Sequence, residues 1–200
     1  MVGDIVGGRP TADFGLFATL NPPEKDAPGF SEWFADGTTH LLGQLASVPG
    51  DDTCWTWYPS DQSVSFWRRR MAHETLIHRW DAQAALGGDV DPIDSTVAAD
   101  GIDEYLDVFV STSRAAAEAP AGPTIGIECT DVDAAWTLGL PEPGKSSVLR
   151  GRASADVTLR ATAAELLLFV WGRSAASESA EIVEGSSELA DMWTFLIPPT

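Results

Sequence analysis

The period of the hydrophobic positions changes once along the chain, near residue 121. Before that point apolar residues recur every three or four positions, which predicts amphipathic helices over about 30–48, 63–86 and 94–118. After it, short stretches alternate apolar and polar residues between turns rich in Pro, Gly and Asp, which predicts strands. The strand candidates are "TIGIECT", "AWTLGL", "SSVLR", "ADVTLR" and "AEIVEG", with a buried helix in "TAAELLLFVWGR" and a closing helix in "SSELADMWTFL".

Two end signals support the predicted helices. Gly87 and Gly88 follow the second helix, in the position where glycine commonly ends one. Asp94 is expected to be the N-cap of the third helix, because its carboxylate can accept from free backbone N–H groups. Helices followed by a mixed region predict a mixed fold of two domains, a helical bundle over 1–120 and a small α+β domain over 121–200.

The charge balance excludes some classes of partner. With 12 Lys and Arg against 30 Asp and Glu, the formal net charge is −18. Duplex nucleic acid and anionic lipid headgroups repel such a surface, so we expect neither nucleic acid nor a membrane as a partner.

Cysteine usage and the apolar runs favour a cytoplasmic protein. Cys54 and Cys129 lie far apart and show no Cys-x-x-Cys spacing, so we expect free thiols rather than a disulfide framework. The first residues show no secretory signal, and the longest apolar run, "ELLLFVWG", is too short to span a bilayer.

The predicted helix over 63–86 carries ionisable residues within its apolar stripe. At about 100° per residue, one face collects Trp67, Met71, Glu74, His78, Asp81, Ala82 and Ala85. The other side, with the character of a solvent face, collects Arg68, Arg69, Arg79 and Gln83. We therefore expect Glu74 and His78 to face the core, where a carboxylate and an imidazole are costly unless they are paired or bound to a metal.

Glu74 and His78 lie one helical turn apart, so their side chains can chelate one metal ion, with Asp81 holding the other ring nitrogen of His78. The same spacing also describes an ordinary helical ion pair, and spacing alone does not decide between the two. "HETLIH" is one residue longer than the His-Glu-x-x-His signature of metallopeptidases. His73 lies about 140° from His78 around the helix, which excludes that activity and leaves His73 as a packed or surface histidine.

Two parts of the chain resemble the actinobacterial mycothiol-dependent maleylpyruvate isomerase-like family. "RRMAHETLIHRWDAQAALG" with "AADGIDEYLDVF" is similar to its metal-binding domain, a DinB-like four-helix bundle. "VTLRATAAELLLFVWGR" with "AEIVEGSSELADMW" is similar to its small C-terminal α+β domain, which resembles sterol-carrier folds. The resemblance covers about residues 30–196.

The resemblance implies that Glu74 and His78 are two of three protein ligands to a divalent metal, usually zinc. The third ligand in the family is a histidine on the second bundle helix. "MVGDIVGGRP" resembles the tail of that helix, so the bundle is expected to be incomplete at its N-terminus, without the first helix and most of the second. His40 is the only other upstream histidine; it could replace that ligand, or it is an exposed or capped helix residue.

The resemblance also implies mycothiol as a cofactor, which adds to the double bond of maleylpyruvate and is expelled after rotation to leave the trans isomer. Zinc favours the deprotonated, nucleophilic thiol. The expected function is a mycothiol-dependent isomerase or transferase that adds a small thiol to a small acidic or electrophilic substrate. Arg173 in "WGR" is a candidate for holding a substrate carboxylate, or it satisfies the last carbonyls of its helix.

A second class of function stays open. Loss of bundle helices would expose an apolar groove that must be covered. The chain can therefore be a non-catalytic or truncated family member, a scaffold that binds a small ligand or a protein, and a homodimer could cover the groove.

Overall fold

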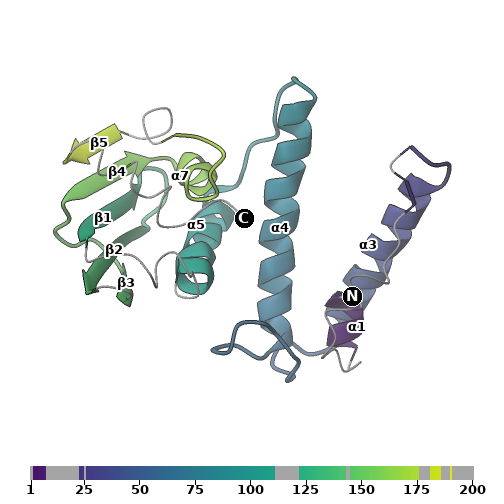
Figure 1. Cartoon of the computed structure of the whole chain (residues 1–200). Coiled ribbons are helices and arrows are strands. Elements are labelled where there is room, and N and C mark those ends of the chain that lie inside the picture. The colour runs from purple at the N-terminus through teal and green to yellow at the C-terminus, as the bar shows by residue number, and fades with distance from the viewer. Residues whose placement is uncertain are drawn as a thin grey trace. The chain divides into compact units, whose positions relative to one another are not determined.

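The computed structural model describes residues 2–7, 23–24, 26–110, 122–142, 145–175, 181–185 and 190 (Figure 1). The chain divides into two compact units, Met1–Arg79 and Trp80–Thr200, and the division falls within helix α4. The first unit is helical, whereas the second combines helices with a five-stranded sheet. This order confirms the predicted fold class, a helical region followed by a small α+β region. The predicted helical residues 111–118 and most of the closing helix over 186–196 lie outside the described residues.

The first unit contains α1 (Val2–Val6), α3 (Phe30–Ser47) and most of α4 (Val64–Ala85). α1 packs against α3 at a close approach, where a Cβ added to Gly3 would lie 3.1 Å from Cδ2 of His40. The two helices can therefore meet at this point because residue 3 has no side chain.

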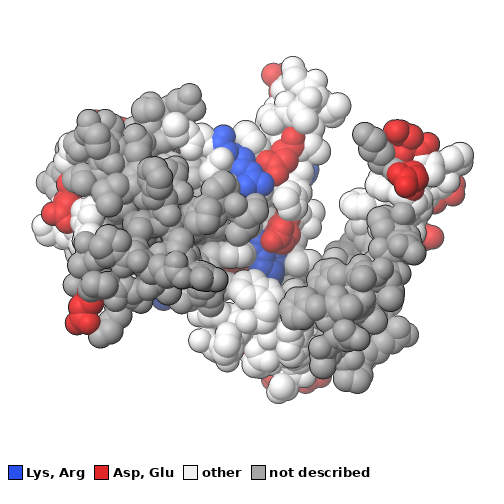
Figure 2. Space-filling view, in the orientation of Figure 1, with Lys and Arg blue, Asp and Glu red and all other residues white. Residues whose placement is uncertain are grey.

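Much of α3 faces solvent in the structure. Its large apolar residues Trp33, Phe34 and Leu42 are exposed, whereas Leu45 is buried. Figure 2 shows acidic side chains on the same part of the molecule, in keeping with the negative charge of the chain. None of the described helices is long and apolar enough to cross a membrane.

Aromatic packing and one arginine fix the start of α4. Phe66 makes edge-to-face contacts with Trp57 and Trp67, with ring centroids 5.6 and 5.4 Å apart. Arg68 donates from Nε and Nη2 to the carbonyl of Leu45, at 2.9 and 2.7 Å. Because a helix end leaves its last carbonyls without backbone partners, Arg68 both satisfies α3 and holds α4 beside it.

The buried face of α4 differs from the predicted stripe. The buried residues are Val64, Phe66, Trp67, Arg70, His73 and Ile77. This face is rotated by about a quarter turn from the predicted one; Trp67 belongs to both, but Ala82 is exposed and the side chain of His78 is 61% exposed. The expectation that the Glu74 and His78 pair faces the core was therefore wrong. Phe66 and Ile77 have far more apolar surface to bury than the alanines of the predicted stripe.

The second unit is built on one sheet with the strand order β3-β2-β1-β4-β5. The strands are β1 (Gly122–Cys129), β2 (Ala135–Glu142), β3 (Lys145–Arg150), β4 (Val157–Ala161) and β5 (Glu181–Glu184), which confirms all the predicted strands. β1 and β4 pair in parallel and the other neighbours pair antiparallel. The helices are α5 (Ser95–Glu104), its π-helical continuation η1 (Tyr105–Val110), and α7 (Ala163–Val170), which packs against α5, β1 and β4 (Figure 1).

The division between the units falls earlier than the predicted boundary at 120/121. α5 belongs to the second unit because it packs against α7 and because Asp103 binds the sheet. Asp103 accepts from Trp136 Nε1 at 3.0 Å, and its two oxygens accept from Arg150 at 2.6 and 3.0 Å. The predicted domain boundary at 120/121 lies at the change of period, where the secondary structure changes from helices to strands, and it stays a prediction.

Asp94 is the N-cap of α5, as predicted. Its Oδ1 accepts from the hydroxyl of Thr96 and from the backbone N–H groups of Thr96 and Val97, at 2.9 and 3.2 Å. The hydroxyl of Thr96, and then the N–H groups of Val97 and Thr96, hold the pKa of this carboxyl below its ordinary value of 3.8.

We predict that Asp94 stabilises the fold at neutral pH and loses this effect in acid. Because the folded pKa is lowered, the contribution is present above the ordinary value of 3.8 and is lost as the pH falls through the folded value. Urea unfolding of the wild type and Asp94→Asn, between neutral pH and about pH 2, tests this. Asparagine keeps the cap without titrating. The difference in unfolding free energy should change below about pH 4, and a constant difference would contradict the prediction.

Candidate functional site

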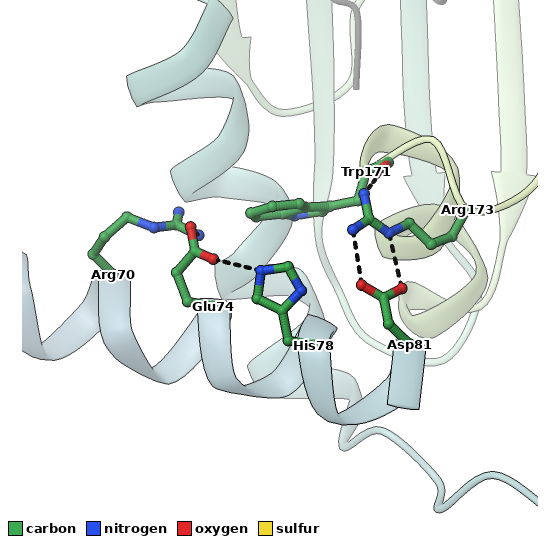
Figure 3. A network of polar contacts seen from close by, with 6 residues as sticks. All are labelled: Arg70, Glu74, His78, Asp81, Trp171 and Arg173. Carbon is green, nitrogen blue, oxygen red and sulfur yellow. Dashed lines mark hydrogen bonds and ion pairs between the residues drawn. The ribbon is translucent and has the colours of Figure 1, made fainter. Parts of the chain in front are cut away.

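Three ionisable side chains form a row on α4, one turn apart (Figure 3). Arg70 Nη2 donates to Glu74 Oε1 at 2.9 Å, and His78 Nε2 lies 3.1 Å from Glu74 Oε2. The two oxygens of Glu74 therefore have different partners, a guanidinium on one side and an imidazole on the other. The structure thus brings together Glu74 and His78, the pair that the sequence pattern singled out.

The pair has the spacing and the donor chemistry of two ligands on one metal. Zinc binds carboxylate oxygen and imidazole nitrogen at about 2.0–2.2 Å, which puts two tetrahedral donors about 3.4 Å apart. Glu74 Oε2 and His78 Nε2 are 3.1 Å apart, and the side chains are 34% and 61% exposed, so a solvated ion can reach both. The residues present therefore fit one side of a metal site.

The part of the chain that the structure describes holds no group of three His, Cys, Asp or Glu side chains suited to a metal. His40 lies on α3 beside Gly3 and is exposed, and it is not gathered with Glu74 and His78. The remaining coordination positions are thus left to water, to a small ligand, or to donors outside the described residues.

Asp81, predicted to hold the second ring nitrogen of His78, binds Arg173 (Figure 3). Arg173 Nε and Nη2 donate to the two oxygens of Asp81 at 3.1 and 2.9 Å, and Nη1 donates to the carbonyl of Trp171 at 2.6 Å. Of the two roles that its sequence context suggested, the contact with a carbonyl at the end of its helix is present, whereas the binding of a substrate carboxylate stays a prediction. Arg173 holds a carboxylate in its bidentate fork, that of Asp81, and it satisfies a carbonyl just after α7 ends.

An aromatic cluster supports Arg173 from the side of η1. Trp171 packs against Tyr105 and Phe109, with ring centroids 5.4 and 5.8 Å apart, and the guanidinium of Arg173 lies 5.9 Å from the centroid of Trp171. Burial raises the pKa of Tyr105, and the positive charge of Arg173 opposes that shift. The π-helical turn brings Tyr105 and Phe109 onto one side, 5.2 Å apart. π-turns are rare and frequently occur at functional sites.

Neither cysteine is suited to act as a nucleophile. Burial raises the pKa of the Cys129 thiol to about 11, with a further rise from Asp131 and an opposing effect of Arg152. Burial, and then the charge of Asp61, raises the pKa of Cys54. Both cysteines are free, as predicted.

Arg70 is the residue of this row that the sequence analysis missed. It is 2% exposed and lies on the buried face of α4 with His73, also 2% exposed, which confirms His73 as a packed histidine. The sequence does contain a signal for Arg70, because it precedes Glu74 by four positions, as Glu74 precedes His78. Such spacing makes a continuous ladder of charges on one helix.

Fold and site together define a protein with a helical region that carries a Glu/His pair and an α+β region that carries a carboxylate-binding arginine. Two family models match the chain: the mycothiol maleylpyruvate isomerase N-terminal domain over residues 18–83 and the MDMPI C-terminal domain over residues 96–191. Together the two matches cover most of the chain, which therefore belongs to the mycothiol maleylpyruvate isomerase-like family. The comparison with curated proteins found no match.

Part of the chain is also similar to solved structures of sterol carrier proteins. Sterol carrier protein 2 from Yarrowia lipolytica is 18% identical, with 54% of this chain and 93% of that chain covered and a TM-score of 0.35. A ubiquinone synthesis protein, UbiJ-SCP2, is 22% identical over 49% of this chain and 96% of that chain, with a TM-score of 0.31. Similarity at this level does not transfer a ligand or an activity to this chain.

We predict that Cys129 stays unreactive while the protein is folded. With a pKa of about 11 instead of 9.0, its thiolate fraction near pH 8 falls about a hundredfold, and burial blocks access as well. Timed alkylation with iodoacetamide, read by mass spectrometry on Cys54→Ser, should label Cys129 only after denaturant is added. Labelling of the folded protein at the rate of a free thiol peptide would contradict this assignment.

Proposed function

We propose that the chain is a cytoplasmic protein that binds a divalent metal and uses mycothiol, or a similar small thiol, to isomerise or modify a small acidic or electrophilic substrate. The observation that carries the proposal is the contact between Glu74 Oε2 and His78 Nε2 at 3.1 Å. Membership of the mycothiol maleylpyruvate isomerase-like family supports it. Zinc accepts both carboxylate and imidazole ligands and suits this donor set.

A bound metal would keep a position open for the thiol and favour its deprotonated, nucleophilic form. The chain contributes the two donors in a fixed relation, since a helical turn sets the distance between Glu74 and His78. When Nε2 of His78 is on the metal, we propose that Asp81 accepts from its other ring nitrogen. A carboxylate has lone pairs enough to serve both that nitrogen and Arg173.

Arg173 is the residue that we propose for holding a substrate carboxylate. Its guanidinium already binds the carboxylate of Asp81 through two nitrogens, which supports its fitness for a planar anion. An acidic substrate would share or replace Asp81 in this contact. The aromatic cluster around Trp171 would keep the guanidinium in place during the exchange.

A non-catalytic scaffold is the second candidate, and the exposed apolar residues of α3 favour it. Trp33, Phe34 and Leu42 are 43%, 63% and 61% exposed. We propose that these exposed apolar side chains contact a protein partner, and a second copy of the chain could cover them. Under this function the protein binds a partner or a small ligand and needs no metal.

We predict that the purified protein binds about one zinc ion per chain, and that Glu74→Ala and His78→Ala each lower its zinc affinity more than a hundredfold. Mutation of residues that only hydrogen-bond to metal ligands already lowers metal affinity by about 10–100-fold. Removal of a ligand itself is therefore expected to lower the affinity further. Competition with a chromophoric chelator measures the affinity. A sulfur-to-cobalt absorption in the near ultraviolet, after a small thiol is added to the cobalt form, tests thiol binding.

Two matched variants control for general loss of charge or of histidine. Glu32→Ala removes an exposed carboxylate from α3, and His40→Ala removes a histidine that is not gathered with the pair. Both should keep the wild-type affinity. A wild-type zinc affinity in Glu74→Ala would contradict the proposed site. A metal-free wild type that forms dimers in light scattering would favour the scaffold instead.

A further inference from the structure

Arg70 contacts the candidate ligand Glu74 from the buried side of α4. Its side chain is 2% exposed, and Nη2 donates to Glu74 Oε1 at 2.9 Å (Figure 3). A guanidinium loses much hydration when it is buried, so it requires partners of opposite charge and good geometry. One oxygen of Glu74 is therefore committed to a fixed cation, while the other lies 3.1 Å from His78 Nε2.

We propose that Arg70 is a positioning residue for the metal ligand Glu74, an inference that rests on the proposed function. Because Arg70 holds Oε1 while Oε2 lies 3.1 Å from His78 Nε2, the carboxylate would present Oε2 to the ion beside His78. The guanidinium also selects one orientation of the carboxylate, which a free glutamate side chain with three rotatable bonds would not keep.

The direction in which the metal affinity changes when Arg70 is removed distinguishes positioning of Glu74 from a simple effect of the positive charge. A fixed positive charge next to a cation site repels the ion, so if charge alone acted, removal of Arg70 would strengthen metal binding. If Arg70 acts by orienting Glu74, its removal weakens metal binding, as loss of hydrogen-bond partners behind metal ligands usually does.

The experiment compares zinc and cobalt affinity of the wild type, Arg70→Met and Arg70→Lys, by chelator competition on protein whose helix content is checked by circular dichroism. Arg70→Met should bind zinc about 10–100-fold more weakly. Arg70→Lys keeps a charged donor at the same place and should recover part of the loss. Arg69→Met, the matched control, removes an equal charge from the neighbouring position of α4 and should stay near the wild type.

The visible absorption of the cobalt form gives a second measurement. If Arg70 had a purely structural role, its substitution would not change this absorption. Without Arg70, both oxygens of Glu74 can reach the ion, and the coordination number rises. The visible absorption of Co²⁺ is stronger in four-coordinate sites than in sites of higher coordination, so the band should weaken in Arg70→Met and recover in Arg70→Lys.

The outcomes separate this inference from the proposed function. If the wild type binds no metal, both the proposed function and the proposed role of Arg70 are contradicted. If the wild type binds metal but Arg70→Met binds it equally well or more tightly, with an unchanged cobalt spectrum, only the role of Arg70 is overturned. Should Arg70→Met fail to fold, the affinity of Arg70→Lys carries the test: an unchanged affinity would overturn the role, and an intermediate loss of affinity supports it.

Discussion

The helical period of α4 is the constraint on which the candidate site depends. Residues four positions apart lie on one side of a helix, so Arg70, Glu74 and His78 can contact one another in sequence. These distances are set by the backbone of a single 22-residue helix and need no loop to bring the groups together. The start of this helix is held by other parts of the first unit, through the aromatic contacts of Phe66 and the bonds from Arg68 to α3.

Two carboxylates of α4 are each paired with an arginine, one pair in each compact unit, and the two pairs differ. Arg70 is buried and binds one oxygen of Glu74, which leaves the second oxygen available to an ion. Arg173 binds both oxygens of Asp81, and its side chain is 17% exposed. Under the proposed function, the first pair would orient a metal ligand, whereas the second would exchange its carboxylate for that of a substrate. Both pairs are charge-assisted hydrogen bonds between arginine and carboxylate. They differ in the burial of the arginine and in the number of carboxylate oxygens that it binds.

Periodicity predicted the elements well and the faces less well. The helix expected over 63–86 is α4, Asp94 caps α5, and every strand candidate is a strand, since these features depend on local residue patterns. The buried face of α4 was missed because Arg70 and His73 are buried, whereas arginine is mostly exposed in folded proteins and histidine is only intermediate. The place where the compact units divide could not be predicted from the period, because the bonds from Asp103 to Trp136 and Arg150 join residues far apart in the chain. The contact of Arg173 with Asp81, over 92 positions, is non-local in the same way.

The pair on α4 also constrains how metal and thiol would act together. Two ligands from one helical turn hold an ion less firmly than three, so a small thiol that binds the ion would be a ligand as well as a reactant. By linkage, the factor by which the thiol tightens metal binding is the factor by which the metal tightens thiol binding. Since both cysteines of the chain have raised pKa values, they compete poorly for this position near neutral pH. The orientation of Glu74, which Arg70 fixes, would then bear on the affinity for both partners, because metal and thiol share one equilibrium.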